Sequence, residues 1–152
     1  MDRTDRKILA ELQKDGRLSV TELADRVGLG LSLSPCHRRL KALEESGAIL
    51  GYHARLAPSA LGLNFAALVF VTLREVTRQP VADFEAALAE IPQIVEAQRL
   101  FGDPDYLLHV VAKDLPAFQR LYDEQLTSIP NVKRLSSTLV MKEVIQDRLL
   151  PM

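Results

Sequence analysis

The sequence predicts an α+β protein with two units of different construction, and two patterns along the chain carry that prediction. Up to about residue 48, apolar residues recur every three or four positions, the spacing of helices that bury one face. From residue 63 onward, apolar runs typical of strands alternate with helical patterns. We therefore expect a helical unit over residues 1–48, a linker with some strand character over 49–62, and a mixed unit over 63–152.

The composition is that of an ordinary globular protein and provides little net charge for binding a polyanion. The chain has 152 residues, 47% of them hydrophobic and 26% charged, which is enough for two small cores. Residues 1–56 carry ten Lys/Arg against eight Asp/Glu, and residues 57–152 carry nine against twelve. Because this asymmetry is small, a basic face rather than a basic domain would have to bind phosphates.

The cellular location follows from cysteine usage and hydropathy. The single cysteine excludes a disulfide framework within the chain, which fits a reducing compartment. No apolar signal-peptide core follows the charged stretch 1–5, and no apolar run is long enough to span a membrane. We therefore expect a cytoplasmic protein without a membrane partner.

The first unit is expected to contain three short helices. Ile8 and Leu12 have the spacing of a helix that ends near Gly16. Ser19 and Glu22 form a capping-box pattern at the start of a second helix. The third helix follows after a turn.

This third helix carries positive charge on its outer face. Ser34 is expected to cap its N-terminus, with Pro35 at the first helical position. Leu40 and Leu43 face one way, and the basic residues lie on the other side. A basic helix after a short amphipathic one indicates a helix-turn-helix, whose second helix enters the major groove of double-stranded DNA. Residues 48–56 alternate and are expected to be extended, which completes a winged helix-turn-helix unit.

Candidate DNA contacts lie on and around the third helix. Arg38 and Arg39 are the best candidates for guanine edges or phosphates, because guanidinium forks match both. Hydroxyl groups at the helix entrance can meet phosphate oxygens. An ordinary solvated face, with Arg39 and Lys41 paired to acidic residues of the same helix, is the alternative. The further candidates are Ser32, Ser34, Pro35, His37, Lys41 and Arg17.

The second unit is expected to have the element order β-α-β-β-α-β, which is that of the ferredoxin-like fold. Its first helix is expected to begin at Pro80, and its second after an N-cap at Asp114. Helices cover one face of such a sheet, and the other face, also apolar here, needs a partner. The sequence therefore predicts homodimerisation through the open face. The expected strands are 65–73, which should be buried on both faces, and 94–101, 106–112 and 132–145.

Six stretches of the sequence match the motifs of one known family: 5–9, Ser-Pro-Cys-His-Arg-Arg at 34–39, 43–49, Gly-Tyr at 51–52, Gly-Asp-Pro-Asp-Tyr-Leu-Leu at 102–108, and 140–144. Through these motifs the chain resembles the Lrp/AsnC family of transcription regulators over essentially its whole length. The resemblance implies an N-terminal DNA-binding domain, a C-terminal domain responsive to an amino acid, and assembly as dimers and often as tetramers or octamers.

The resemblance also implies a free amino acid as effector, enclosed by the loop 102–105 where two dimers meet. An Asp there would neutralise the ammonium group of the effector. From the residues alone, a plain hairpin turn is the preferred interpretation of this loop, because Gly, Asp and Pro are turn formers. The residues matched to the effector site are Gly102, Asp103, Asp105 and Tyr106, with Thr138 and Met141 on the last strand as weaker candidates.

One departure from the family concerns the turn 28–34, which is two residues longer than usual. The extra residues would either bulge out at Gly30, which permits unusual backbone angles, or displace the third helix and weaken DNA binding. The lengthened turn keeps a second interpretation open, an oligomeric amino-acid-binding module with weak or no DNA binding. The basic third helix argues against that interpretation.

An enzyme is the remaining alternative, and few residues favour it. Cys36 and His37 are adjacent on one helix and point apart, so they cannot form a nucleophile–base pair. No zinc-ligand spacing and no glycine-rich phosphate loop is present in the sequence. We expect no catalytic residues, no metal site and no cofactor.

Overall fold

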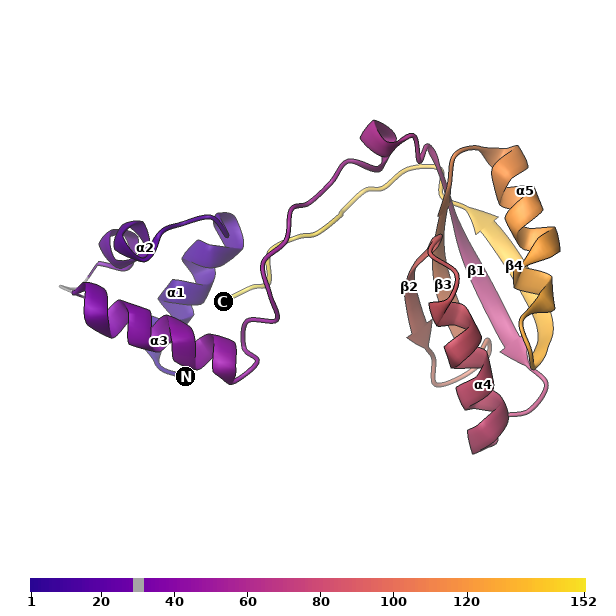
Figure 1. Cartoon of the computed structure of the whole chain (residues 1–152), viewed down its shortest axis with the longest axis horizontal. Helices are drawn as coiled ribbons and strands as arrows, with labels where there is room; N and C mark the ends of the chain where they lie inside the picture. Colours follow the sequence, from indigo (N-terminus) through magenta and orange to yellow (C-terminus); the bar gives the residue numbers. More distant parts are fainter. Residues whose placement is uncertain (29–31) are drawn as a thin grey trace. The chain divides into compact units, whose positions relative to one another are not determined.

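The computed structural model describes residues 1–28 and 32–152, which divide into two compact units (Figure 1). Unit 1 consists of Met1–Arg55 together with Ile145–Met152, and unit 2 consists of Leu56–Val144. We call Ile145–Met152 the returning segment. It was expected to belong to the second unit, but its contacts are with the first, where the Gln13 side chain bonds the backbone of Leu150.

Unit 1 is built from three helices, α1 (Arg3–Lys14), α2 (Val20–Val27) and α3 (Leu33–Glu45). A capping box of Asp2 and Asp5 opens α1, and the expected capping box of Ser19 and Glu22 opens α2. Apolar residues of all three helices meet in one core. Its buried members are Ile8, Leu23, Ala24, Val27, Cys36 and Leu43.

The start of α3 differs from the prediction. Ser32, not Ser34, is the N-cap residue, and its side chain makes no capping hydrogen bond. Pro35 is the third residue of the helix rather than the first. It is tolerated there because the first N–H groups of a helix have no partner within the helix. The turn before α3 includes residues 29–31, so the predicted two-residue extension lies outside the described residues.

The expected extended strand after α3 does not form. Within the described residues the stretch 48–57 pairs with no strand, and Leu50 is 96% exposed. An isolated strand leaves its backbone groups without ladder partners, so local alternation alone does not stabilise it. The stretch ends in a short 3₁₀ helix, η1 (Pro58–Leu61). The wing predicted for this unit is therefore absent from the described part of the chain.

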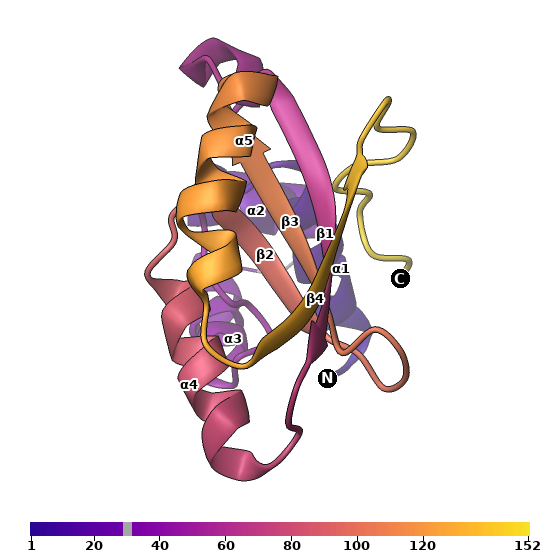
Figure 2. The same ribbon diagram turned by 90° about the vertical axis from the view of Figure 1, so that its right-hand side faces the viewer.

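Unit 2 has the predicted ferredoxin-like order. Its sheet is antiparallel with the order β2-β3-β1-β4, and α4 and α5 lie against the same face (Figure 2). The last strand ends earlier than expected, because the Val140 N–H already bonds to the Ala66 oxygen near the beginning of β1, and no partner strand among the described residues continues beyond. The elements are β1 (Phe65–Leu73), α4 (Arg78–Ala89), β2 (Ile94–Arg99), β3 (Tyr106–Ala112), α5 (Leu115–Glu124), η2 (Leu126–Ser128) and β4 (Val132–Leu139).

The sheet separates a closed face from an open one. Alternate residues of β1 and β3, such as Val69 and Leu108, are fully buried against the helices. The ring of Phe84 on α4 lies 4.8 Å from that of Tyr106, centre to centre. The intervening residues of β1, such as Leu68, are only half-buried. Strand 65–73 is thus buried on one face in the single chain, not on both as predicted.

Candidate functional site

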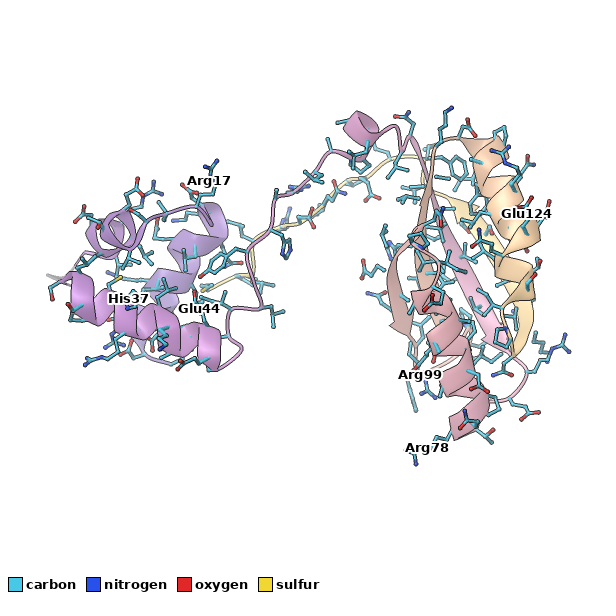
Figure 3. The ribbon with its side chains drawn as sticks, in the orientation of Figure 1. Arg17, His37, Glu44, Arg78, Arg99 and Glu124 are labelled. Carbon is cyan, nitrogen blue, oxygen red and sulfur yellow. The ribbon has the colours of Figure 1, made fainter. Side chains whose placement is uncertain are left out.

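The outer face of α3 presents a row of polar and basic side chains to solvent. His37, which Figure 3 labels on α3, is exposed. Arg38 and Lys41 are exposed as well, whereas Cys36 and Leu43 on the opposite side lie in the core. No described residue forms an ion pair with the guanidinium of Arg38. This face can therefore offer hydrogen-bond donors and positive charge to an external ligand.

Arg39 points elsewhere, contrary to the expectation that both arginines face a ligand. Its Nη1 lies 2.7 Å from Oδ2 of Asp2 and 2.8 Å from Oδ1 of Asp5. These hydrogen bonds raise the pKa of Arg39 above its ordinary value. The pKa of Asp2 is lowered, first by the hydrogen bond from the Asp5 N–H and then by Arg39. Arg39 joins α3 to the start of α1 and leaves Arg38 as the arginine of α3 that faces solvent.

The other predicted DNA contacts have mixed surroundings. Ser32 and Ser34 are exposed at the start of α3, and Pro35 beside them is half-buried. Lys41 lies 3.6 Å from the carboxylate of Glu45 one turn on, which is the intrahelical pairing that the sequence offered as an alternative. Both side chains are about two-thirds exposed, so this contact is weak. Arg17, between α1 and α2, is exposed (Figure 3).

In unit 2 the loop 102–105 joins β2 to β3, and one of its two carboxylates holds the loop in place. Oδ2 of Asp105 accepts a 2.7 Å hydrogen bond from the Leu73 N–H, and the Asp105 N–H donates to the Val71 oxygen at 2.9 Å. Gly102 has φ of 149°, a region that favours glycine. The carboxylate of Asp103 is exposed. Asp105 therefore stabilises the loop, and Asp103 is the carboxylate available to a ligand.

Tyr106, matched to the effector site, lies in the core instead. The residue is 3% exposed, and its hydroxyl donates to Oε1 of Glu85 on α4. Burial, and then this hydrogen bond, raise the pKa of Tyr106 to about 12. The side chain faces the helices, because β-strand side chains alternate and its neighbour Leu107 lies on the open face.

Thr138 lies on the opposite side of the sheet from Tyr106. It is paired in register with Leu68 on the open face, whereas Tyr106 is paired with Val71 on the closed face. Met141, just after β4, is 98% exposed. The six predicted effector residues therefore do not form one pocket in the single chain.

Two features were missed by reasoning from the sequence. Phe101, taken as the end of a strand, is fully exposed immediately before Gly102. The second is a groove in unit 1 that the returning segment lines, described below. Within residues 1–28 and 32–152, no group of three His, Cys, Asp or Glu side chains is arranged to hold a metal ion. In that same part of the chain, no helix is both long and apolar enough to cross a membrane.

A helix-turn-helix unit joined to a ferredoxin-like unit defines a class of protein, a DNA-binding regulator with a separate ligand-binding unit. Family models support both halves. Residues 1–49 match the winged helix-turn-helix DNA-binding model, and residues 66–150 match the Lrp/AsnC ligand binding domain. The chain belongs to the Lrp/AsnC family of transcriptional regulators.

Characterised relatives and solved structures agree with this assignment. The Bkd operon transcriptional regulator of Pseudomonas aeruginosa is 42% identical over 95% of this chain and 94% of its own. The leucine-responsive regulatory protein of Rhizobium meliloti is 42% identical over 95% and 91%. A transcriptional regulator from Neisseria meningitidis in complex with L-methionine superposes with a TM-score of 0.91, at 38% identity over 99% of this chain and 96% of its own.

Proposed function

We propose that this protein binds double-stranded operator DNA through α3 and that a free amino acid controls the binding. The observation that carries the DNA contact is the outer face of α3, where Arg38, His37 and Lys41 are exposed while Arg39 is held inside the unit. An arginine fork on the outer face of a recognition helix matches guanine edges and phosphates. We assign base contact to Arg38 and phosphate contact to Lys41, Arg17 and the hydroxyls of Ser32 and Ser34.

We propose that the protein acts as a homodimer formed through the open face of the sheet in unit 2. Four apolar residues of that face, on the two central strands, are only half-buried in the single chain, and an exposed apolar patch of this kind marks an interaction surface. A dimer presents two copies of α3, as needed for successive major grooves about 34 Å apart. Dimers are proposed to assemble further into tetramers or octamers. The four residues are Leu68, Phe70, Leu107 and Val111.

We propose that the effector binds at the loop 102–105, where Asp103 neutralises its ammonium group. Support comes from the exposure of Asp103 beside Gly102 and from the relative that binds L-methionine. Thr138 and Met141 remain candidates for contacts made between dimers, whereas Asp105 and Tyr106 shape the loop from inside. The effector would act by changing either the assembly or the orientation of the DNA-binding units.

We further propose that the protein is not an enzyme, needs no cofactor and works in the cytoplasm. The relatives named above are regulators, and Cys36, the one cysteine, is fully buried in the core of unit 1. Burial raises the pKa of the Cys36 thiol, which disfavours the reactive thiolate.

The test is a gel-shift titration of the promoter of the neighbouring gene, with and without each of the amino acids. We expect a shifted complex whose affinity or mobility depends on one amino acid or a small group of them. Absence of binding to every local promoter under all conditions would overturn the DNA function. In that case, binding of an amino acid by calorimetry would favour the oligomeric ligand-binding module instead.

A further inference from the structure

Unit 1 contains an apolar groove on the side of α1. The groove has a volume of about 670 Å³ and lies between Leu9 and Leu12 of α1 and the stretch 48–52 that follows α3. Leu9, Leu12 and Ile49 also pack against the buried core of the unit, so the groove is continuous with that core. Such a surface is costly to leave open to water, and the chain itself provides a partner for it.

The returning segment forms one wall of this groove. Leu150, Pro151 and Met152 line it together with α1 and the stretch 48–52, so the volume of about 670 Å³ is the space that remains with the segment in place. The side-chain amide of Gln13 clamps the backbone of Leu150: its Oε1 accepts from the Leu150 N–H at 2.7 Å, and its Nε2 donates to the Leu150 oxygen at 3.3 Å. One glutamine thus satisfies both backbone groups of a single residue 137 positions further along, as when an extended peptide is recognised through its main chain.

A second anchor lies at Arg55, the last residue of the first stretch of unit 1. Its Nε is 2.7 Å from Oδ2 of Asp147, and its Nη2 donates to Oε1 of Gln146 at 3.1 Å. Both partners of the ion pair are about 60% exposed, so the pair is weak and sensitive to salt. Leu150 also keeps 73% of its surface exposed. Contacts of this kind hold a segment reversibly rather than permanently.

We propose that the returning segment is an intramolecular docking arm, which binds the groove of unit 1 in its own chain and can be released from it. The chain links the three helices of unit 1 to unit 2 at residues 55–56. The docked arm adds a second, noncovalent connection between these helices and the chain that follows β4 through residues 140–144. When the arm is released, only the link at residues 55–56 remains. A link from this arm to DNA affinity rests on the proposed function, but the docking itself does not.

Crosslinking of the full-length chain tests which molecule occupies the groove. Arg6→Cys and Met152→Cys, at two residues that line the groove and take no part in the Gln13 clamp, are combined in one chain and treated with a short bismaleimide; the two single variants serve as controls, and Cys36 is buried. We expect crosslinked product at the size of one chain. Product at the size of two chains would assign the groove to a second copy, and no crosslinking would mean that the arm does not dock. Either result overturns the proposal, whether or not the protein binds DNA.

Limited proteolysis measures how often the arm is released. Trypsin can cleave after Arg148 in the arm, and when opening is fast the cleavage rate follows the open population. We expect Gln13→Ala to raise this rate roughly tenfold, equivalent to about 1.4 kcal/mol. Gln119→Ala on the exposed side of α5 should leave it unchanged.

A substitution in the arm itself covers the case in which Gln13→Ala disturbs the fold of α1. Asp147 has φ of 47°, which asparagine tolerates, so Asp147→Asn removes the charge without straining the backbone. We expect cleavage after Arg148 to become up to about fivefold faster, as suits the loss of an exposed ion pair. Cleavage at the wild-type rate in both Gln13→Ala and Asp147→Asn would overturn the proposal.

Discussion

Replacing Arg38 and Arg39 one at a time should separate DNA contact from the stability of unit 1. Arg38 is exposed and forms no ion pair with a described residue, so Arg38→Ala should leave the melting temperature within about 3 °C of the wild type. Arg39→Ala leaves Asp2 and Asp5 without their cation and should lower the melting temperature. We therefore expect Arg38→Ala to lower DNA affinity without a loss of stability, and Arg39→Ala to lower stability.

The expected loss of affinity follows from the number of Arg38 side chains in the proposed dimer. A bidentate arginine–guanine contact is worth about 1–3 kcal/mol, and two copies of α3 present it twice. Arg38→Ala should thus cost about 2–6 kcal/mol of operator binding, a loss of at least roughly 30-fold. If Arg38 contacted only phosphates, the slope of log affinity against log salt would instead fall by about 0.9 for each contact.

Fluorescence anisotropy with labelled promoter DNA, between about 50 and 200 mM salt, measures both quantities. Calorimetric melting of the same samples reports stability, and Arg78→Ala, an exposed arginine of unit 2, is the matched control (Figure 3). A loss of DNA binding in Arg39→Ala at an unchanged melting temperature would refute the reasoning. It would mean that Arg39 leaves its carboxylates to contact DNA.

Three further predictions concern the loop 102–105, Asp2 and Cys36. Asp103→Ala should weaken the effector response measured by calorimetry, with little effect on melting. Asp105→Ala should destabilise unit 2 by roughly 1–3 kcal/mol in urea unfolding, because it removes a hydrogen bond from a backbone N–H to a carboxylate. Equal melting of the two variants would contradict this. The Asp5 N–H lowers the pKa of Asp2 in the folded state, so the ionised Asp2 carboxylate stabilises the fold. This stabilisation is present above the unfolded-state pKa and is lost as pH falls through the lower folded-state pKa. Asp2→Asn should therefore make stability, followed by circular dichroism in an acid titration, depend less on pH below about pH 4. Cys36→Ser places a hydroxyl in a fully buried site and should destabilise unit 1 by about 1–3 kcal/mol in denaturant melts, while a wild-type thiol that reacts fast without unfolding would show that the site is open.

Local patterns were sufficient to predict most of the fold. The capping box of Ser19 and Glu22 involves neighbouring residues, and the strand–helix rhythm of unit 2 restricts the topology to a few arrangements, of which the ferredoxin-like one was chosen and confirmed. Predictions failed where a segment depends on distant partners. The stretch 48–56 alternates like a strand but has no partner strand among the described residues, and the salt bridge of Arg39 with Asp2 spans 37 positions without any spacing signal.

The returning segment illustrates the same limit. It was expected to belong to the second unit, which was predicted over residues 63–152. Its contact at Leu150 is made instead by the Gln13 side chain, which a helical pattern assigns only to the outside of α1. A polar residue beside an apolar groove is a weak signal in a sequence, because most exposed glutamines bind only water.

In both candidate sites, one charged residue of the motif is exposed and a nearby one is bonded within its own unit. On α3, successive residues are rotated by about 100°, so Arg38 faces solvent while Arg39 reaches α1. At the loop, Asp103 is exposed while Asp105 bonds the end of β1. A run of charged residues in such a motif therefore contains both groups that hold the unit together and groups that are exposed for a ligand. The prediction that every motif residue contacts DNA or the effector ignores this division, and the paired substitutions Arg38/Arg39 and Asp103/Asp105 distinguish the two kinds by whether affinity or stability changes.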